Sequence, residues 1–122
     1  MTVRTRAELG ALGEELAAQR LTAAGLQVLD RNWRCRYGEL DVVAAEPDTG
    51  TVVFVEVKTR TTDRYGGVAE AVTPEKVRRL RRLAGLWLAG QQRGWAAVRI
   101  DVIGVRFGRT REPEITHVRG VG

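Results

Sequence analysis

A strand that is apolar along its length yet carries two full charges is the feature that most constrains this chain. Residues 52–58 read Val-Val-Phe-Val-Glu-Val-Lys, and such a run of β-branched and aromatic residues predicts a buried strand. Because side chains alternate across a strand, Glu56 and Lys58 project from the same face. A buried carboxylate is costly unless a cation or hydrogen bonds compensate its charge. The pattern therefore indicates a functional site built into a sheet.

A second strand-like run shows the same anomaly. Asp41 lies within Gly-Glu-Leu-Asp-Val-Val at residues 38–43, and Pro-Asp-Thr-Gly at 47–50 predicts a turn between the two runs. The two strands should form a hairpin, and if the loop centres on this turn, Asp41 and Glu56 lie almost opposite each other. Two acids and a lysine on neighbouring strands could hold a hard divalent cation and orient a water molecule beside it.

The rest of the pattern predicts an α/β fold in a single domain, residues 1–122, with its core at about 5–106. A capping box at residues 5–8 should begin a helix that ends at Gly25, and Thr73-Pro74 should begin a second helix that ends before Gly90. The order is helix, three strands, helix and strand, with a mixed central sheet flanked by helices and a short C-terminal edge strand. The expected strands are residues 26–33, 38–46, 51–60, 95–106 and 114–118.

Helical periodicity places charged side chains on particular faces of the two helices. On the first helix, Glu14 falls at the margin of the apolar side and Glu15 points to solvent. On the second helix, Lys76 projects to the apolar side. The opposite side carries Arg78, Arg79 and Arg82. A lysine in the first turn opposes the helix dipole, so either an anionic group lies nearby or the lysine stem rests on apolar surface with its amine in water.

Composition favours a polyanionic partner. The net charge is +5, which makes nucleic acid the default partner, although such a charge could also serve solubility alone. The basic residues comprise 18 arginines and only 2 lysines, Lys58 and Lys76. In a chain that has drifted towards arginine, a retained lysine indicates a need for a compact point charge, with chance retention as the alternative.

Cysteine and histidine are too scarce for several classes of site. With Cys35 as the one cysteine and His117 as the one histidine, the chain can form neither an internal disulfide nor a zinc cluster. We expect Cys35 to fill a strand position and His117 to lie at the surface or at a sheet edge. Asp101 could be a further site acid, but we expect it to form an ion pair with an arginine.

The chain shows no sign of membrane attachment or export. Its first residues contain no apolar signal core, and no apolar stretch approaches about 18 residues. We therefore expect a cytoplasmic protein with no membrane partner.

The ordered set of motifs resembles the PD-(D/E)XK nuclease superfamily. Within it, the chain is most similar to the bacterial family UPF0102, also called YraN-like, which resembles archaeal Holliday-junction resolvases. The resemblance covers about residues 9–105. It rests on Gly13-Glu14, Gly-Glu-Leu-Asp at 38–41, Phe-Val-Glu-Val-Lys-Thr-Arg at 54–60, and Lys76. The chain departs from the motif at Leu40, where the proline that gives the motif its name would stand.

The resemblance implies a restriction-endonuclease-like core and a metal-dependent endonuclease that hydrolyses phosphodiester bonds in structured or branched DNA. Position by position, Asp41 and Glu56 match the metal-binding acids, Lys58 the catalytic lysine, and Glu14 the helix-borne acid of resolvase-type members. Mg²⁺ or Mn²⁺ is the implied cofactor, and a homodimer is the implied assembly.

The basic residues around this set would hold the DNA backbone without reading its sequence. They are Arg60, Arg64, Lys76, Arg78, Arg79 and Arg82. Two other functions stay open. One is a catalytically inactive nucleic-acid-binding module of the same fold that assists DNA repair or recombination. The other is a protein–protein adaptor whose positive charge is incidental.

Overall fold

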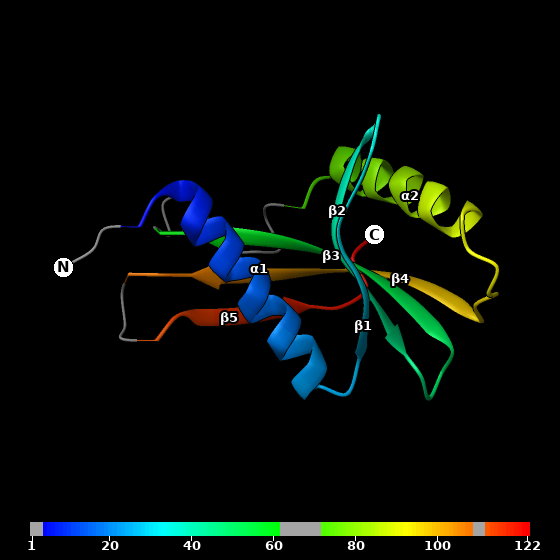
Figure 1. The fold of residues 1–122 in the computed structure, drawn as a ribbon, viewed down its shortest axis with the longest axis horizontal. Helices are drawn as coiled ribbons and strands as arrows, with labels where there is room; N and C mark the ends of the chain where they lie inside the picture. Colours follow the sequence, from blue (N-terminus) through cyan, green and yellow to red (C-terminus); the bar gives the residue numbers. More distant parts are fainter. Residues whose placement is uncertain (1–3, 62–71, 109–111) are drawn as a thin grey trace.

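One mixed sheet with a helix on each face makes up the part of the chain described by the computed structural model, residues 4–61, 72–108 and 112–122. The strands lie in the order β1-β2-β3-β4-β5 (Figure 1). The elements are α1 (Arg6–Ala23), β1 (Gln27–Cys35), β2 (Gly38–Glu46), β3 (Thr51–Arg60), α2 (Pro74–Ala89), β4 (Ala97–Arg106) and β5 (Glu114–Val118). The expected α/β layout and element order are confirmed.

The sheet is mixed because one of its pairs is parallel. β3 and β4 run parallel and stay in register from Thr51 opposite Ala97 to Arg60 opposite Arg106. The other three pairs are antiparallel. α2 provides the crossover between the two parallel strands, as such a connection requires. Residues 62–71, between β3 and α2, lie outside the described residues.

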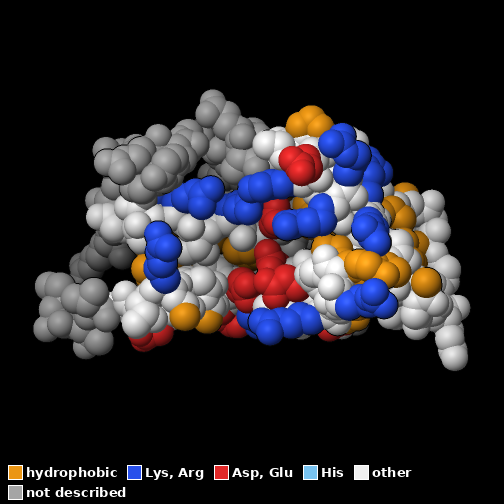
Figure 2. Space-filling model, turned by 90° about the horizontal axis from the view of Figure 1, so that it is seen from above, with side chains coloured by type: hydrophobic (Ala, Val, Ile, Leu, Met, Phe, Trp, Pro, Cys, Tyr) orange, Lys and Arg blue, Asp and Glu red, His pale blue; other side chains and the backbone are white. Residues whose placement is uncertain are grey.

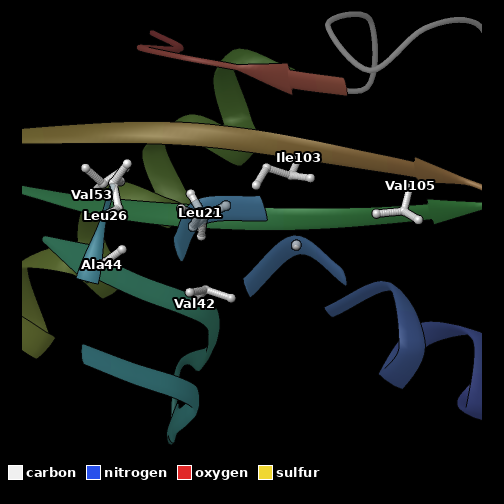
Figure 3. Close-up of a cluster of buried hydrophobic side chains, with 9 residues drawn as sticks. Leu21, Leu26, Val42, Ala44, Val53, Ile103 and Val105 are labelled. Carbon is white, nitrogen blue, oxygen red and sulfur yellow. The ribbon is translucent and has the colours of Figure 1, made fainter. Parts of the chain in front are cut away.

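α1 covers one face of the sheet. The predicted capping box is present, with Thr5 accepting a hydrogen bond from the Glu8 backbone and Glu8 accepting one from the Thr5 backbone. The helix ends before Gly25, whose φ of +92° suits glycine. Its buried side packs onto the sheet in a cluster shown in Figure 3. The cluster comprises Ala17, Leu21, Leu26, Val42, Ala44, Val53, Val55, Ile103 and Val105.

α2 covers the opposite face. Thr73 caps it by accepting a hydrogen bond from the Lys76 backbone, and Pro74 occupies the first turn, where the lack of an N–H costs nothing. Trp87 meets Phe54 edge to face, with ring centroids 5.6 Å apart. The second cluster comprises Leu40, Val43, Val52, Phe54, Leu80, Leu83, Ala84, Trp87 and Ile100. The two clusters hold the helices on opposite faces of the sheet.

The strand bounds follow the expected ones closely, with two differences. β1 continues to Cys35, because Cys35 pairs with Gly38 across a two-residue turn. β4 begins at Ala97, so Trp95 precedes the strand. No helix in the described residues is long and apolar enough to cross a membrane.

Candidate functional site

β2 separates from β3 at Asp41, and this separation creates the candidate site. The pairing of β2 with β3 runs only from Glu46–Thr51 to Val42–Val55. Residues two apart on a strand normally share a face, yet Leu40 packs with the α2 cluster and Val42 with the α1 cluster. The alternation therefore breaks at Asp41. Because the sheet opens here, groups from both faces can meet.

Asp41 occupies the opening. If the register continued, it would lie opposite Glu56, as expected from the sequence. Its carboxylate Oδ2 accepts a hydrogen bond from the backbone N–H of Val57 at 2.8 Å, in place of a carbonyl of β2. Burial raises the pKa of Asp41 to about 6, against the lowering effect of this hydrogen bond, and the charges of Glu14, Glu56 and Glu39 raise it further. Asp41 is thus a carboxylate beside other acids.

Glu56 is the second buried acid, and basic side chains surround it. Only 11% of its side chain is exposed, and its Oε1 lies 3.8 Å from Lys58 Nζ and 3.4 Å from an Arg79 guanidinium nitrogen. Arg79 reaches across from α2 and remains 57% exposed. Arg79 is exposed on α2, as expected from its helix face, and the sequence did not predict that its long side chain reaches the buried carboxylate of Glu56.

Lys58 lies next to Glu56 and to Lys76 of α2. Burial lowers the pKa of Lys58, Glu56 raises it, and the nearby amine of Lys76 lowers it again. Lys76 is half-buried. The amine of Lys76 thus lies beside the amine of Lys58, and Lys58 in turn lies beside the carboxylate of Glu56. An amine whose pKa is lowered in this way can exchange a proton more readily than a free lysine.

Glu14 approaches from the other face, and Gly13 allows that approach. A Cβ atom at Gly13 would lie 2.3 Å from the Thr59 hydroxyl oxygen, so only glycine lets α1 come this close to β3. Glu14 is half-buried and close enough for its charge to raise the pKa of Asp41. A pocket of about 500 Å³ opens beside it between α1 and the end of β3. Its lining includes Arg6, Glu14 and Arg60.

The donor set of this site can be compared with the needs of a metal ion. Within residues 4–61, 72–108 and 112–122, no three Asp, Glu, His or Cys side chains are grouped closely enough to hold a metal by themselves. Mg²⁺ is usually bound through one or two carboxylates, with water and substrate phosphate completing its octahedron. Asp41 and Glu56 provide two carboxylates, so the residues present fit that mode of binding.

The predicted nucleic-acid-binding residues do not all lie together. Arg60 lines the pocket beside α1. On α2, Arg79 reaches Glu56 and Lys76 lies beside Lys58, whereas Arg82 reaches Tyr37 at the β1–β2 turn. Arg78 is exposed on α2. Arg64 lies outside the described residues. Figure 2 shows acidic side chains gathered in the middle of one face, with lysine and arginine side chains on both sides of them.

Asp101, a further buried acid, lies in β4 and is paired with an arginine, as expected. Arg99 donates two hydrogen bonds to its carboxylate at 2.9 and 3.0 Å, and the Gly120 backbone donates a third. His117 Nε2 lies 2.7 Å from the same carboxylate. These hydrogen bonds lower the pKa of Asp101 although its burial raises it. Asp101 thus differs from Asp41 in having an ion-pair partner, Arg99.

His117 and Cys35 can be compared with their expected positions. His117 lies on the edge strand β5, as expected, but only 12% of its side chain is exposed because it turns in to Asp101. Cys35 is a half-buried strand residue packed against the α2 cluster, as expected.

Sequence reasoning missed Tyr37, at the turn between β1 and β2. The ring is 45% exposed, and the guanidinium groups of Arg36 and Arg82 lie 5.0 and 4.3 Å from its centroid. The available signal was an aromatic residue beside arginines in a short turn, Arg-Tyr-Gly at 36–38.

Fold and site together define an α/β protein with an acid–lysine cluster at a split in its sheet. Residues 13–105 match the model of the family described as "Uncharacterised protein family UPF0102". Relatives named "UPF0102 protein" include one from Mycobacterium ulcerans, 73% identical over the whole of both chains. Another, from Mycobacterium avium, is 71% identical over 99% of this chain and 94% of its own. The chain belongs to the UPF0102 family.

Proposed function

We propose that this protein is a divalent-metal-dependent endonuclease that hydrolyses phosphodiester bonds in structured or branched DNA. The observation that carries the proposal is the half-buried carboxylate of Asp41, which lies beside acids and forms no ion pair with any described residue. The buried acid Asp101, by contrast, has an arginine, a histidine and a backbone N–H around it. Asp41 has three acids around it and a pKa raised to about 6. A carboxyl group whose pKa is raised by burial and by neighbouring charges is typical of a functional site.

Each residue of the cluster has a role in the proposed reaction. Asp41 and Glu56 hold the cation, with Glu14 on the opposite side of the opening. The cation, when bound, lowers the pKa of water and offsets negative charge on the phosphate. Lys58 Nζ positions the attacking water and accepts its proton, which is favoured by a lowered lysine pKa. As water adds to phosphorus, the bond to the leaving sugar oxygen breaks, and that oxygen gains a proton from solvent.

The basic side chains support DNA as the substrate. Arg79 and Lys76 lie on one side of the acids, and Arg60 lies in the pocket on the other side. A phosphate backbone could thus run past the acids between positive charges, held by contacts that carry no sequence information. A preference for structured DNA would then come from the shape of the bound strands.

One observation favours a second candidate, a nucleic-acid-binding module without turnover. Lys58 and Arg79 already neutralise Glu56. If these ion pairs persist in solution, Glu56 is a structural partner and its charge is unavailable to a cation. Such a protein would bind DNA through its arginines alone, with affinity that falls as salt rises and with no need of metal.

Cleavage assays with matched variants separate the two candidates. Branched, flapped and linear DNA are incubated with the protein and Mg²⁺, Mn²⁺ or EDTA. We expect cleavage with metal and none with EDTA. Asp41→Asn and Lys58→Met should each abolish it, whereas Glu15→Gln, which neutralises an exposed acid paired with Arg31, should leave it unchanged. Binding without cleavage by the wild type would support the second candidate. Cleavage that survives both site variants would overturn the nuclease proposal.

A further inference from the structure

Tyr37 is presented on a fixed part of the backbone. It occupies the two-residue turn between Cys35 and Gly38, and Cys35 packs against the α2 cluster. Gly38 has a φ of +144°, and a Cβ atom there would lie 3.4 Å from Leu83, so the turn rests closely on α2. Arg34 and Glu39 form an ion pair across the hairpin at 3.1 Å. A large aromatic ring is thus held at the surface by packed neighbours.

The ring has positive charge beside it. Arg36 lies 5.0 Å and Arg82 4.3 Å from its centroid, within the range of cation–π contacts. An aromatic ring between arginines has the composition of single-strand binding surfaces, where bases stack on the ring and cations hold the backbone. A purely structural ring would gain by packing further in, whereas Tyr37 remains 45% exposed.

Tyr37 lies close to the candidate site along α2. Arg79 reaches Glu56 and Arg82 reaches Tyr37. These two arginines are three residues apart, which is a rise of about 4.5 Å and nearly one helical turn. They therefore project from neighbouring positions on the same side of the helix. A nucleic-acid strand held by Arg79 and Arg82 would pass from the acids to the ring.

We propose that Tyr37, flanked by Arg36 and Arg82, is a stacking platform for one unpaired base of a DNA strand bound at the acid–lysine site. This inference rests on the proposed function and extends it by naming the substrate class, DNA with an unpaired base next to the cleaved bond. Because both guanidinium groups lie over the ring, the base stacks on one ring face in place of a guanidinium group, and the two guanidinium groups contact the phosphates on either side. Paired bases remain in their own stack and do not use the platform.

Strand-binding measurements without cleavage test the platform. Fluorescence anisotropy is recorded in EDTA with a short single strand and with the same strand carrying abasic sites. We expect the wild type to bind the strand with bases about tenfold more tightly, as one stacked base provides. Tyr37→Ala should bind both strands equally, at the abasic level, and Tyr37→Phe should keep the preference. Val98→Ala removes an equally exposed apolar side chain on β4 and should behave as wild type.

A salt titration distinguishes loss of charge from loss of stacking. Loss of a phosphate contact changes the slope of log affinity against log salt, whereas loss of stacking does not. Tyr37→Ala should keep the wild-type slope of log affinity against log salt, because no phosphate contact is lost, whereas Arg82→Ala should lower the slope by about one. The platform would be overturned if Tyr37→Ala kept the preference for the strand with bases, or if the wild type bound both strands equally. The nuclease proposal would then still be decided by its cleavage assay. A wild type that binds neither single strand at low salt would likewise overturn the platform, and the cleavage assay on branched DNA would still decide the nuclease proposal.

Discussion

The carboxylate of Asp41 accepts the backbone hydrogen bond of Val57 at 2.8 Å, at the point where β2 leaves β3. In a regular sheet that N–H would bond to a carbonyl of the neighbouring strand. The side chain of Asp41 thus closes a gap in the ladder and at the same time lies among acids. Asp41 therefore satisfies the backbone N–H of Val57 at the position where the two strands separate and the candidate site lies.

Neutralising Asp41 should stabilise the metal-free protein at neutral and alkaline pH. Asp41→Asn keeps an oxygen that accepts the Val57 hydrogen bond and removes the charge. Because the pKa in the fold is raised to about 6, wild-type stability falls as pH rises from the unfolded-state value near 4 through 6. The variant lacks this fall and should be more stable by roughly 2–3 kcal/mol at pH 8.

Chemical denaturation in EDTA at several pH values measures the effect. The advantage of Asp41→Asn should shrink as pH drops through about 6 and vanish below about 4. Asp48→Asn, at an exposed turn position, is the control and should change little. If Asp41→Asn were less stable than wild type at pH 8, the charge of Asp41 would stabilise the fold. That result would contradict the assignment of Asp41 to a metal site.

Mg²⁺ should raise the melting temperature of the wild type. A ligand that binds only the folded state stabilises it by RT ln(1 + [L]/Kd), or about 1.4 kcal/mol at a concentration ten times Kd. Asp41→Asn and Glu56→Gln each remove one carboxylate charge and should lose most of the response. Differential scanning fluorimetry with and without EDTA checks this, with Glu15→Gln as a control that keeps the shift. Equal shifts in all four proteins would place the bound cation elsewhere.

Gly13 and Gly10 should respond in opposite directions to the same substitution. Both lie in α1, where alanine is intrinsically better than glycine by about 0.5–1 kcal/mol. Nothing lies within 4 Å of a Cβ atom at Gly10, so Gly10→Ala should stabilise. At Gly13 the Cβ atom would meet the Thr59 hydroxyl oxygen at 2.3 Å, and Gly13→Ala should destabilise by about 1–3 kcal/mol.

A double-mutant cycle with Thr59→Ala identifies the cause. Removing the hydroxyl should recover most of the loss in Gly13→Ala, with a coupling energy of about 1 kcal/mol or more in urea denaturation. Additive effects would show that Gly13 matters for a reason other than the approach of α1 to β3. The same approach positions Glu14, so Gly13→Ala should also weaken any metal response.

Replacing Asp101 should destabilise the protein strongly, in contrast to Asp41. Asp101→Asn removes one of the two carboxylates that pair with Arg99 in the described part of the chain and leaves Glu46, and this loss at a partly buried ion pair should cost about 2–3 kcal/mol. Because the pKa of Asp101 is lowered in the fold, its contribution is fully present above about pH 4 and is lost as pH falls below that value. Denaturation curves at pH 7 and pH 3 should therefore differ from wild type most at pH 7. An equal loss of stability at pH 7 and at pH 3 would show that Asp101 contributes through side-chain packing and not through its charge.

The local patterns predicted much of the fold. The capping box of Thr5 and Glu8, the glycine after α1 and the proline at the start of α2 fix helix ends through contacts a few residues apart. The turn at 47–50 sets the β2–β3 register, and so the relation of Asp41 to Glu56. These features depend on neighbours in the sequence, so the sequence displays them directly.

The unpredicted parts depend on residues that are distant in the chain. Periodicity assigns Arg79 to a helix face, but its reach to Glu56 depends on where α2 lies over the sheet. The partner of His117 is Asp101 of another strand, and the cation–π neighbour of Tyr37 is Arg82 of α2. The broken alternation at Asp41 likewise follows from the hairpin docking on α2. Such contacts exist only once the layers are packed together.

The separation of β2 from β3 also changes the character of β3 along its length. From Glu56 onwards, β3 is paired among the described strands with β4 alone, so this half is an edge strand and can template pairing with another copy of the chain. Lys58 and Arg60 place charges along that edge, and charged edge residues oppose such aggregation. Replacing Lys58 with an apolar residue therefore removes a safeguard against self-association together with a reactive amine. The activity measured for such a variant should therefore be divided by the concentration of protein that remains monomeric.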